Sequence, residues 1–198
     1  MGEIVVVENI TLDGVMQAPG SAEEDRTGGF PYGGWASPYA DPVAFETMGQ
    51  GMAADGAMLF GRRTYLSLHR AWAGRRDGNP YTEVLDRKTK YVASRTLSDP
   101  LPWENSVLLG DDVTGRVAGL RAGPAGDMAV LGSGTLVRAL AAAGLVDQYV
   151  LLIHPLTLGT GTKLFAEDAP ARRELTLLGS VTTTTGVIIA RYRPVVSP

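Results

Sequence analysis

The sequence predicts an α/β fold in which strands alternate with helices and an antiparallel hairpin closes the chain. Short apolar runs that end in a polar or glycine-rich turn and continue as a helical pattern recur along the sequence, which is typical of strand–turn–helix units. Near the C-terminus, residues 174–193 contain two β-rich runs that turn around Thr185-Gly186. The length of 198 residues fits one domain, which we place at 1–198.

The composition excludes several classes of function. With 44% hydrophobic residues, 20% charged residues and a formal net charge of −3, the chain can build a core and lacks the basic surface of a nucleic-acid-binding protein. It has no cysteine and two histidines, so we expect no disulfide and no metal site. No segment reaches the roughly 18 apolar residues of a membrane span, and the N-terminus lacks a signal-peptide pattern. We therefore predict a cytoplasmic protein without a membrane partner.

The first forty residues combine a strand with an unusually long loop. Residues 4–10 form a β-branched apolar run and predict a buried strand. Residues 17–40 show no periodicity, and a loop of this length in a compact domain favours a functional flap. Its aromatic side chains either cover a flat ring of a ligand or pack into the core. They are Phe30, Tyr32, Trp35 and Tyr39. A helix is predicted to begin at Asp41-Pro42, with the carboxylate as its N-cap.

Three apolar segments each deliver a polar or glycine-rich turn. These segments are residues 57–60, 91–93 and 128–131. The turns that follow them are Gly61-Arg62-Arg63-Thr64, Ser94-Arg95-Thr96 and Gly132-Ser133-Gly134, and helices are predicted over 65–72 and 135–143. Ligands bind at the carboxyl ends of strands in open α/β sheets. The three turns together therefore predict a ligand site.

The residue types in these turns point to phosphate. Glycines before a helix let phosphates approach backbone N–H groups at the positive end of the helix, although Gly132-Ser133-Gly134 could equally be an ordinary turn with Ser133 as N-cap. Arg62 and Arg63 oppose the macrodipole of the helix that they begin, which a bound anion would explain. Arg95 could bind a 2′-phosphate through two hydrogen bonds. The alternative is that the arginines are solvated or paired with nearby acidic residues.

The order and spacing of these motifs resemble those of dihydrofolate reductase-like proteins. The chain is most similar to the small bacterial branch related to the reductase domain of bifunctional riboflavin-biosynthesis deaminase-reductases. Two further motifs resemble that branch, namely Thr11-Leu12-Asp13-Gly14 and Leu158-Gly159-Thr160-Gly161 with Leu164-Phe165. The resemblance spans almost the whole chain and implies a three-layer α/β/α fold with a mixed, mostly parallel central sheet and the C-terminal antiparallel hairpin. The histidine-glutamate and paired-cysteine signatures of the deaminase half are absent.

The resemblance implies an NADPH-dependent reductase that transfers a hydride to a small, unidentified substrate. The substrate could be pterin-like, or ribosylamino-pyrimidine-like as for 5-amino-6-(5-phosphoribosylamino)uracil reductases. The implied cofactor-binding residues are Gly61, Arg62, Arg63, Thr64, Ser94, Arg95, Gly132, Ser133, Gly134, Thr135 and Leu136. The implied substrate-binding residues are Asn9, Met16, Trp35 and Phe45. Related reductase domains commonly pair, so a homodimer is expected.

The proton that accompanies the hydride needs a source, and three carboxylates are candidates. Asp41 is the first choice, because folate reductases place a substrate-facing carboxylate at this point and burial under an aromatic lid would raise its pKa. Its alternative role is the helix N-cap. Asp13 is alternatively a turn former, and Glu46 a solvated residue on the helix surface. Two other functions stay open: a true dihydrofolate reductase, and a nucleotide-binding protein of the same fold without turnover.

Overall fold

A computed structural model describes residues 1–53, 56–76, 78, 80–123, 125–165 and 172–195 of the chain. The chain divides into two compact units. The first unit comprises residues 1–5 and 48–145, and the second comprises residues 6–47 and 146–198. The strand β1 (Ile4–Thr11) begins in the first unit and continues in the second. Whether residues 1–198 behave as one domain stays a prediction.

The strands form a mixed sheet in the hydrogen-bonded order β4-β3-β2-β5-β1-β6-β8-β7. In the first unit, β2 (Ala57–Gly61) pairs in parallel with β3 (Lys90–Ala93) and with β5 (Met128–Val130), and β3 pairs in parallel with β4 (Ser106–Leu108). In the second unit, β8 pairs antiparallel with both of its neighbours. The predicted sheet, mostly parallel with an antiparallel C-terminal hairpin, is confirmed.

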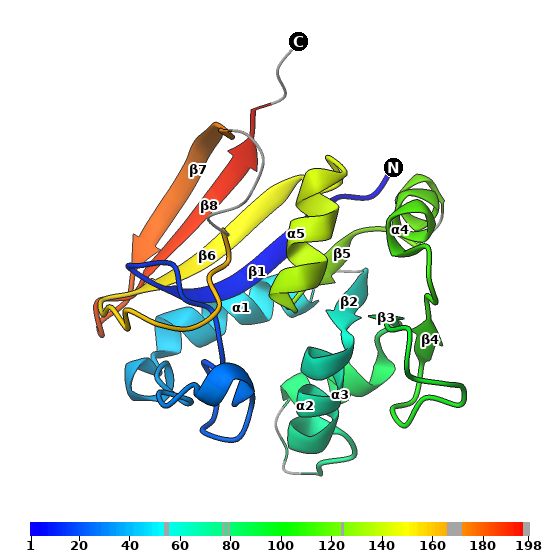
Figure 1. The fold of residues 1–198 in the computed structure, drawn as a ribbon, viewed down its shortest axis with the longest axis horizontal. Helices are drawn as coiled ribbons and strands as arrows, with labels where there is room; N and C mark the ends of the chain where they lie inside the picture. Colours follow the sequence, from blue (N-terminus) through cyan, green and yellow to red (C-terminus); the bar gives the residue numbers. More distant parts are fainter. Residues whose placement is uncertain (54–55, 77, 79, 124, 166–171, 196–198) are drawn as a thin grey trace. The chain divides into compact units, whose positions relative to one another are not determined.

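Two helices of the first unit follow strands as the strand–turn–helix pattern predicts, namely α2 (Arg62–Trp72) after β2 and α5 (Gly134–Ala142) after β5. Two more helices, α3 (Pro80–Arg87) and α4 (Val113–Ala122), were not predicted, and β3 is followed by the strand β4 and not directly by a helix. Figure 1 shows α2 continuing from the tip of β2. The helix α2 begins at Arg62, three residues before the predicted start, so both arginines of the turn lie inside its first turn.

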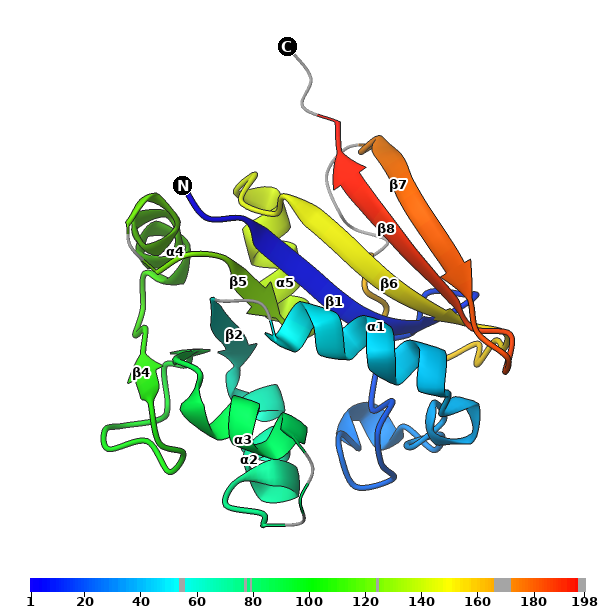
Figure 2. The ribbon, with the colours of Figure 1, turned by 180° about the vertical axis from the view of Figure 1, so that it is seen from behind.

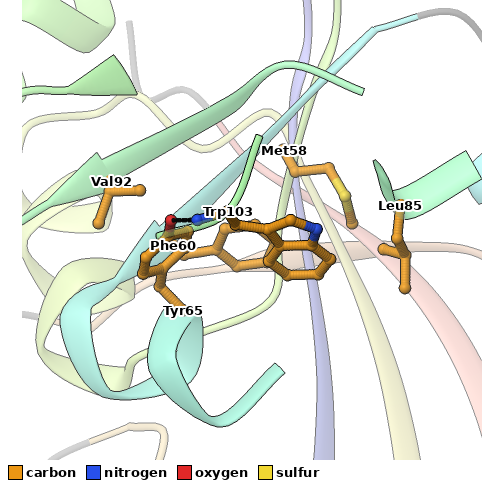
Figure 3. Close-up of a cluster of buried hydrophobic side chains, with 6 residues drawn as sticks. All are labelled: Met58, Phe60, Tyr65, Leu85, Val92 and Trp103. Atoms are coloured by element: carbon orange, nitrogen blue, oxygen red, sulfur yellow. Dashed lines mark hydrogen bonds between the residues drawn. The ribbon is translucent and has the colours of Figure 1, made fainter. Parts of the chain in front are cut away.

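An aromatic cluster forms the core beneath α2. Tyr65, on the second turn of this helix, is completely buried against Phe60 of β2 and against Trp103, which precedes β4. The Tyr65 hydroxyl accepts a hydrogen bond from the Trp103 backbone N–H at 2.9 Å (Figure 3). Because a buried hydroxyl needs a partner, this bond fixes the segment before β4 onto α2. The cluster is completed by Met58, Leu85 and Val92.

The second unit contains the antiparallel strands. They are β6 (Gln148–His154), β7 (Leu175–Thr182) and β8 (Ile188–Pro194), which run side by side in Figure 2. The turn between β7 and β8 closes with a hydrogen bond from the Gly186 N–H to the Thr183 carbonyl. The predicted turn position at Thr185-Gly186 is therefore confirmed.

The long loop 17–40 has its own small core. It contains two short 3₁₀ helices, Thr27–Gly29 and Ser37–Tyr39. Phe30 and Trp35 are each 7% exposed and pack with Val15 and Ala18. Of the two roles that the sequence left open for these aromatics, core packing is the one observed for Phe30 and Trp35, whereas Tyr32 is exposed. The helix α1 (Pro42–Ala53) follows the loop.

Candidate functional site

The three predicted turns lie at one edge of the parallel sheet in the first unit. The register pairs Gly61 with Ala93 and Leu59 with Val130, so β2, β3 and β5 end at similar heights. Parallel neighbours carry their carboxyl ends at the same edge, where open α/β sheets bind ligands. The structure thus brings together the turn residues that were separated in sequence by up to about seventy positions, from Gly61 to Gly134.

Two of these turns touch through their backbones. The Gly61 N–H donates a 2.9 Å hydrogen bond to the Gly132 carbonyl. A Cβ atom on Gly61 would lie 2.4 Å from Ser133 Oγ and 3.0 Å from the Ser133 backbone nitrogen, closer than real side chains approach. Glycine at position 61 is therefore required by this contact and not by its backbone torsions, since its φ is −76°. The peptide bond between Gly132 and Ser133 is cis.

Two helices begin here without a side-chain cap. Gly61 holds the N-cap position of α2 and Ser133 that of α5, and neither side chain bonds the backbone of its helix. Neither first turn contains an acidic residue. The side chain of the N-cap residue therefore supplies no oxygen acceptor at either N-terminus, and an anion is an acceptor that suits such a helix end. The alternative in which the Ser133 side chain caps its helix is not the arrangement observed.

Three arginines lie in the turns at this edge of the sheet. Arg62 and Arg63 are exposed in the first turn of α2, where Arg63 has an interaction with another group, and Arg95 is exposed directly after β3. The Ser94 Oγ atom accepts hydrogen bonds from the Thr96 and Leu97 N–H groups at 3.1 and 3.0 Å. The Ser94 side chain therefore stabilises the turn that contains Arg95.

The remaining predicted cofactor residues differ in exposure. Thr64 is half-buried in the first turn of α2, and Thr135 is exposed in the first turn of α5. Gly134 and Leu136 are buried, so only their backbones can meet a ligand. The side chain of Leu136 instead contributes to the apolar face of α5 together with Val137 and Leu140.

In the second unit, Asp41 is a buried cap with several partners. Its Oδ1 accepts from the Val43 N–H at 2.7 Å, and its Oδ2 accepts from the N–H of Thr184 at 2.8 Å and from the Thr184 hydroxyl. The Thr184 hydrogen bond is the main cause that lowers the pKa of Asp41, and it outweighs the opposite effect of burial. The expectation that the pKa of Asp41 is raised is therefore wrong, because its hydrogen bonds outweigh the effect of burial. The carboxylate joins the start of α1 to the turn between β7 and β8.

Asp13 joins the two loop motifs that resemble the riboflavin-reductase branch. Its carboxylate accepts from the N–H groups of Leu158 and Gly159 and from the Thr11 hydroxyl, the last at 2.5 Å. The Thr11 bond is the first cause that lowers the pKa of Asp13. These contacts explain why an aspartate before Gly14 is useful to the fold. Whether it also acts in chemistry stays a prediction.

A second polar group lies around His154, at the end of β6. His154 is 4% exposed, and its Nε2 lies 2.9 Å from Asn9 Oδ1 on β1. The rings of Trp35 and Tyr39 meet the imidazole edge to face, with centroid distances of 5.1 and 5.4 Å. Burial lowers the pKa of His154 to about 4, so the ring is neutral at pH 7. His154 is the last residue of β6, and its contact with Asn9 was not predicted from the sequence.

The other predicted substrate-side residues are dispersed. Met16 is 8% exposed, and its N–H bonds the Thr162 carbonyl. Phe45, on α1, is 58% exposed. Glu46, next to it, is also exposed, as the alternative of a residue on the helix surface expects.

Glu8 is a buried carboxyl group that sequence reasoning missed. It lies on β1 with 7% exposure, and its Oε1 atom is buried without a hydrogen-bond partner. Burial raises its pKa to about 8, and the charge of Glu24 adds to the rise. A signal was present, because Glu8 occupies the buried position in the alternation with Ile4, Val6 and Ile10.

Neither a metal centre nor a membrane-spanning helix is found in the described part of the chain. No group of three or more histidine, cysteine, aspartate or glutamate side chains there could hold a metal ion. No helix in the described part of the chain is both long enough and apolar enough to cross a membrane.

Several solved structures share the fold of this chain. One is a protein of Shewanella sp. PV-4 that is provisionally described as a riboflavin biosynthesis protein. It superposes on this chain with a TM-score of 0.73 at 20% sequence identity, and the superposition covers 98% of this chain and 99% of the other. Dihydrofolate reductase from Enterococcus faecalis, complexed with NADP(H) and RAB-propyl, gives a TM-score of 0.63 at 12% identity over 98% and 96% of the two chains. The dihydrofolate reductase-like fold is confirmed.

The RibD C-terminal domain model matches residues 3–189, and the chain belongs to that family. A sequence relative is the uncharacterized protein YyaP of Bacillus subtilis (strain 168), which is 31% identical over 110 residues. That match covers 56% of this chain and 57% of YyaP, so it spans little more than half of the relative's length. The resemblance recognised in the sequence is thereby confirmed, and a reductase-type enzyme is the class that fold and family support.

Proposed function

We propose that this protein is an NADPH-dependent reductase that acts on a small heterocyclic or sugar-derived substrate. The observation that carries the proposal is the pair of uncapped helix N-termini, α2 and α5, at the same sheet edge as Arg62 and Arg95. A pyrophosphate fits backbone N–H groups at helix N-termini that no N-cap side chain covers, and a 2′-phosphate fits exposed guanidinium groups. Bound NADPH would supply the hydride.

The residues of this chain would bind the cofactor in separate ways. The Gly132-Ser133-Gly134 turn would hold the pyrophosphate, because its backbone is free of bulky side chains and begins α5. Arg62, Arg63 and Arg95 would hold the 2′-phosphate. Thr64 and Thr135, in the first turns of the two helices, would donate hydroxyl hydrogen bonds to the phosphates.

The proton source is less constrained than the cofactor site. The hydrogen bonds of Asp41 and Asp13 lower the pKa of both carboxyls, which favours structural roles for them and makes each a poor acid at pH 7. Glu46, exposed on α1, or a bound water would then deliver the proton. The same contacts of Asp41 weaken the case for a true dihydrofolate reductase, in which this position would face the substrate.

The arginines give the sharpest test of the cofactor assignment. We expect Arg95→Ala and Arg62→Ala each to narrow the preference for NADPH over NADH by about tenfold, because a charge-assisted hydrogen bond contributes roughly 1.5 to 3 kcal/mol. Fluorescence titration with both cofactors measures the effect. Arg70→Ala is the matched control, since Arg70 is exposed at the other end of α2. If the preference for NADPH over NADH is unchanged in both variants, Arg62 and Arg95 do not bind the 2′-phosphate.

Assembly and location are further parts of the proposal. We expect a homodimer in the cytoplasm, with a small-molecule substrate and no nucleic-acid or membrane partner. Light scattering coupled to size-exclusion chromatography, at protein concentrations from 1 μM to 100 μM (about the range in which ordinary interfaces dissociate), measures the subunit number. A mass of one chain at every concentration would contradict the dimer.

A further inference from the structure

A cavity of about 740 Å³ lies at the end of α2 that is remote from the candidate cofactor turns. Its wall comes from the C-terminal end of α2, from α3 and from the segment before β4, all of which belong to the first unit. Asp86 and Glu104 line it and precede the first residues of β3 and β4, so the cavity lies at the amino ends of these parallel strands. With a rise of about 1.5 Å per residue, the eleven residues of α2 separate it from the turn at Arg62 by about 16 Å.

Trp103 forms a fixed part of the cavity wall. Its side chain is 3% exposed, and its indole N–H donates to Asp86 Oδ1 at 2.6 Å. The Lys90 ammonium group lies 4.8 Å from the centroid of the Trp103 ring. One oxygen of Asp86 is therefore occupied and its carboxylate is held in place, which preorganises this side of the cavity.

Three charged side chains of the wall make no bond with one another. Arg76, Glu83 and Glu104 are exposed, and no hydrogen bond or ion pair of their side chains is found within the described part of the chain. Small-molecule sites fix their ligands with a few polar groups that converge on a cavity of this size. The described residues offer no group of three or more carboxylates and histidines that could hold a metal ion, so the carboxylates here suit an organic cation.

The position of the carboxylates favours an ammonium group at one side of the cavity. Glu83 and Asp86 are three residues apart on α3, so they lie on the same side of that helix. The helix α2 ends at the same cavity, with Ala73 as its C-cap, and the negative end of a helix macrodipole favours a cation. Arg76 lines the cavity as well and suits a carboxylate.

The formal charges around the cavity balance. Counted with His69 neutral, the positive side chains are Arg75, Arg76 and the underlying Lys90, and the negative side chains are Glu83, Asp86 and Glu104. A ligand with a net charge would therefore leave an excess of one sign. A ligand that is neutral overall but carries separate positive and negative groups complements both kinds of side chain.

We propose that this cavity binds a neutral α-amino acid, whose ammonium group binds the carboxylates of Glu83 and Asp86 and whose carboxylate binds Arg76. The site is separate from the turns to which we assign NADPH, and the inference does not depend on the reductase function. It assigns the protein a second small-molecule ligand.

Nuclear magnetic resonance titration of the full-length protein locates the site. Protein labelled uniformly with nitrogen-15 is titrated with L-leucine and with L-phenylalanine. We expect shifts of the Trp103 indole N–H and of the Gly74 backbone N–H, both of which belong to the cavity wall. The backbone N–H groups of Gly61 and Gly132, in the cofactor turns, should not shift.

Two ligand analogues test the recognition of each charge. N-acetyl-L-leucine lacks the ammonium group and L-leucinamide lacks the carboxylate. Each should bind at least about tenfold more weakly than L-leucine, because it loses one charge-assisted interaction.

Substitutions in the wall test the residues. We expect Arg76→Gln and Glu83→Gln each to weaken L-leucine binding by about tenfold and to leave the melting temperature unchanged, since both side chains are exposed. Arg70→Gln is the matched control, because Arg70 is exposed in the last turn of α2 and does not line the cavity.

Four outcomes would overturn the proposal. The first is the absence of shifts with both amino acids, and the second is equal binding of either analogue, which would show that one charge suffices. The third is unchanged L-leucine binding in both Arg76→Gln and Glu83→Gln. The fourth is a set of shifts confined to Gly61 and Gly132, which would place the ligand at the cofactor turns. Failure of NADPH to bind would contradict the proposed reductase and leave this inference as it stands.

Discussion

Single buried side chains determine how the stability of this protein should change with pH. Glu8 is the clearest case, because burial raises its pKa from 4.5 to about 8. Between these two values the folded protein retains a proton that the unfolded chain has released. The free energy of unfolding therefore contains a contribution that is complete below pH 4.5 and is lost as the pH rises through 8.

We expect Glu8→Gln to remove this loss of stability with rising pH. The amide has the same shape and stays neutral, so between pH 5 and pH 8 the variant should gain stability relative to wild type by roughly 3 kcal/mol. Urea unfolding at a series of pH values measures the difference. Glu23→Gln, an exposed substitution in the same unit, is the control and should leave the pH profile as it is. Parallel profiles for wild type and Glu8→Gln would show that Glu8 is ionised at neutral pH.

The sequence indicated where charged side chains gather but not which of them are buried. Lys90 was placed outside the third strand, which was predicted over residues 91–93. It is the first residue of β3 and completely buried, because its ammonium group donates to three backbone carbonyls, those of Asp86, Lys88 and Glu104. The carbonyls of Asp86 and Lys88 lie just before the strand, but whether they turn toward the Lys90 ammonium group depends on the folded backbone, and Glu104 lies fourteen residues further along the chain, so the sequence pattern does not reveal this set of acceptors.

At the level of helices and strands, Asp41 connects α1 with the hairpin formed by β7 and β8. We expect Asp41→Asn to lower the free energy of unfolding by roughly 1 to 3 kcal/mol. An NH₂ group in place of Oδ2 accepts no hydrogen bond, so it loses both the bond from the Thr184 N–H and the bond from the Thr184 hydroxyl. An isolated N-cap would lose much less, since asparagine caps as well as aspartate. Thermal unfolding measures the loss.

Thr184→Val provides the matched control for Asp41. It removes the hydroxyl donor and leaves the capping bond to the Val43 N–H, so it should reproduce part of the loss. The two substitutions combined should be less than additive if they break one interaction. Full stability of Asp41→Asn would show that the carboxylate only caps α1.

The close contact of Gly61 with the turn at Ser133 predicts how a methyl group at position 61 changes the stability of the protein. We expect Gly61→Ala to destabilise the protein by about 1 to 3 kcal/mol and to weaken NADPH binding, since its Cβ would displace Ser133. Gly119→Ala is the control. Gly119 lies in α4 with nothing near its missing Cβ, so the substitution should be neutral or stabilising. Equal stability and affinity in wild type and Gly61→Ala, by thermal unfolding and titration, would show that the turns do not need this close contact.

The elements that could be predicted are those with a strong local signal. The apolar strands before the three turns were predicted to within one residue, because each is a short β-branched or apolar run with a polar boundary. The helix α4 was missed. Two glycines, Gly115 and Gly119, weaken its helical pattern, and its start depends on a hydrogen bond from the Gly115 N–H to Asp112.

For the whole molecule, the order of the motifs was sufficient to identify the family and the fold. The mixed sheet and the closing hairpin agree with that prediction. The candidate phosphate site was also predictable, because all its turns directly follow strands. The partners of Asp41, Asp13 and Asn9 were not, since each contact joins positions more than 140 residues apart. Such pairs are set by the tertiary fold and leave no local pattern in a single sequence.

Three arginines and the N-termini of α2 and α5 are the groups that we propose bind NADPH. The affinity of the wild-type protein for NADPH and for NADH, titrated under identical buffer and salt conditions, tests this proposal. We expect NADPH to bind at least about tenfold more tightly, because NADH lacks the 2′-phosphate that the arginines would bind. Equal affinities for the two cofactors, or no binding of either, would contradict it.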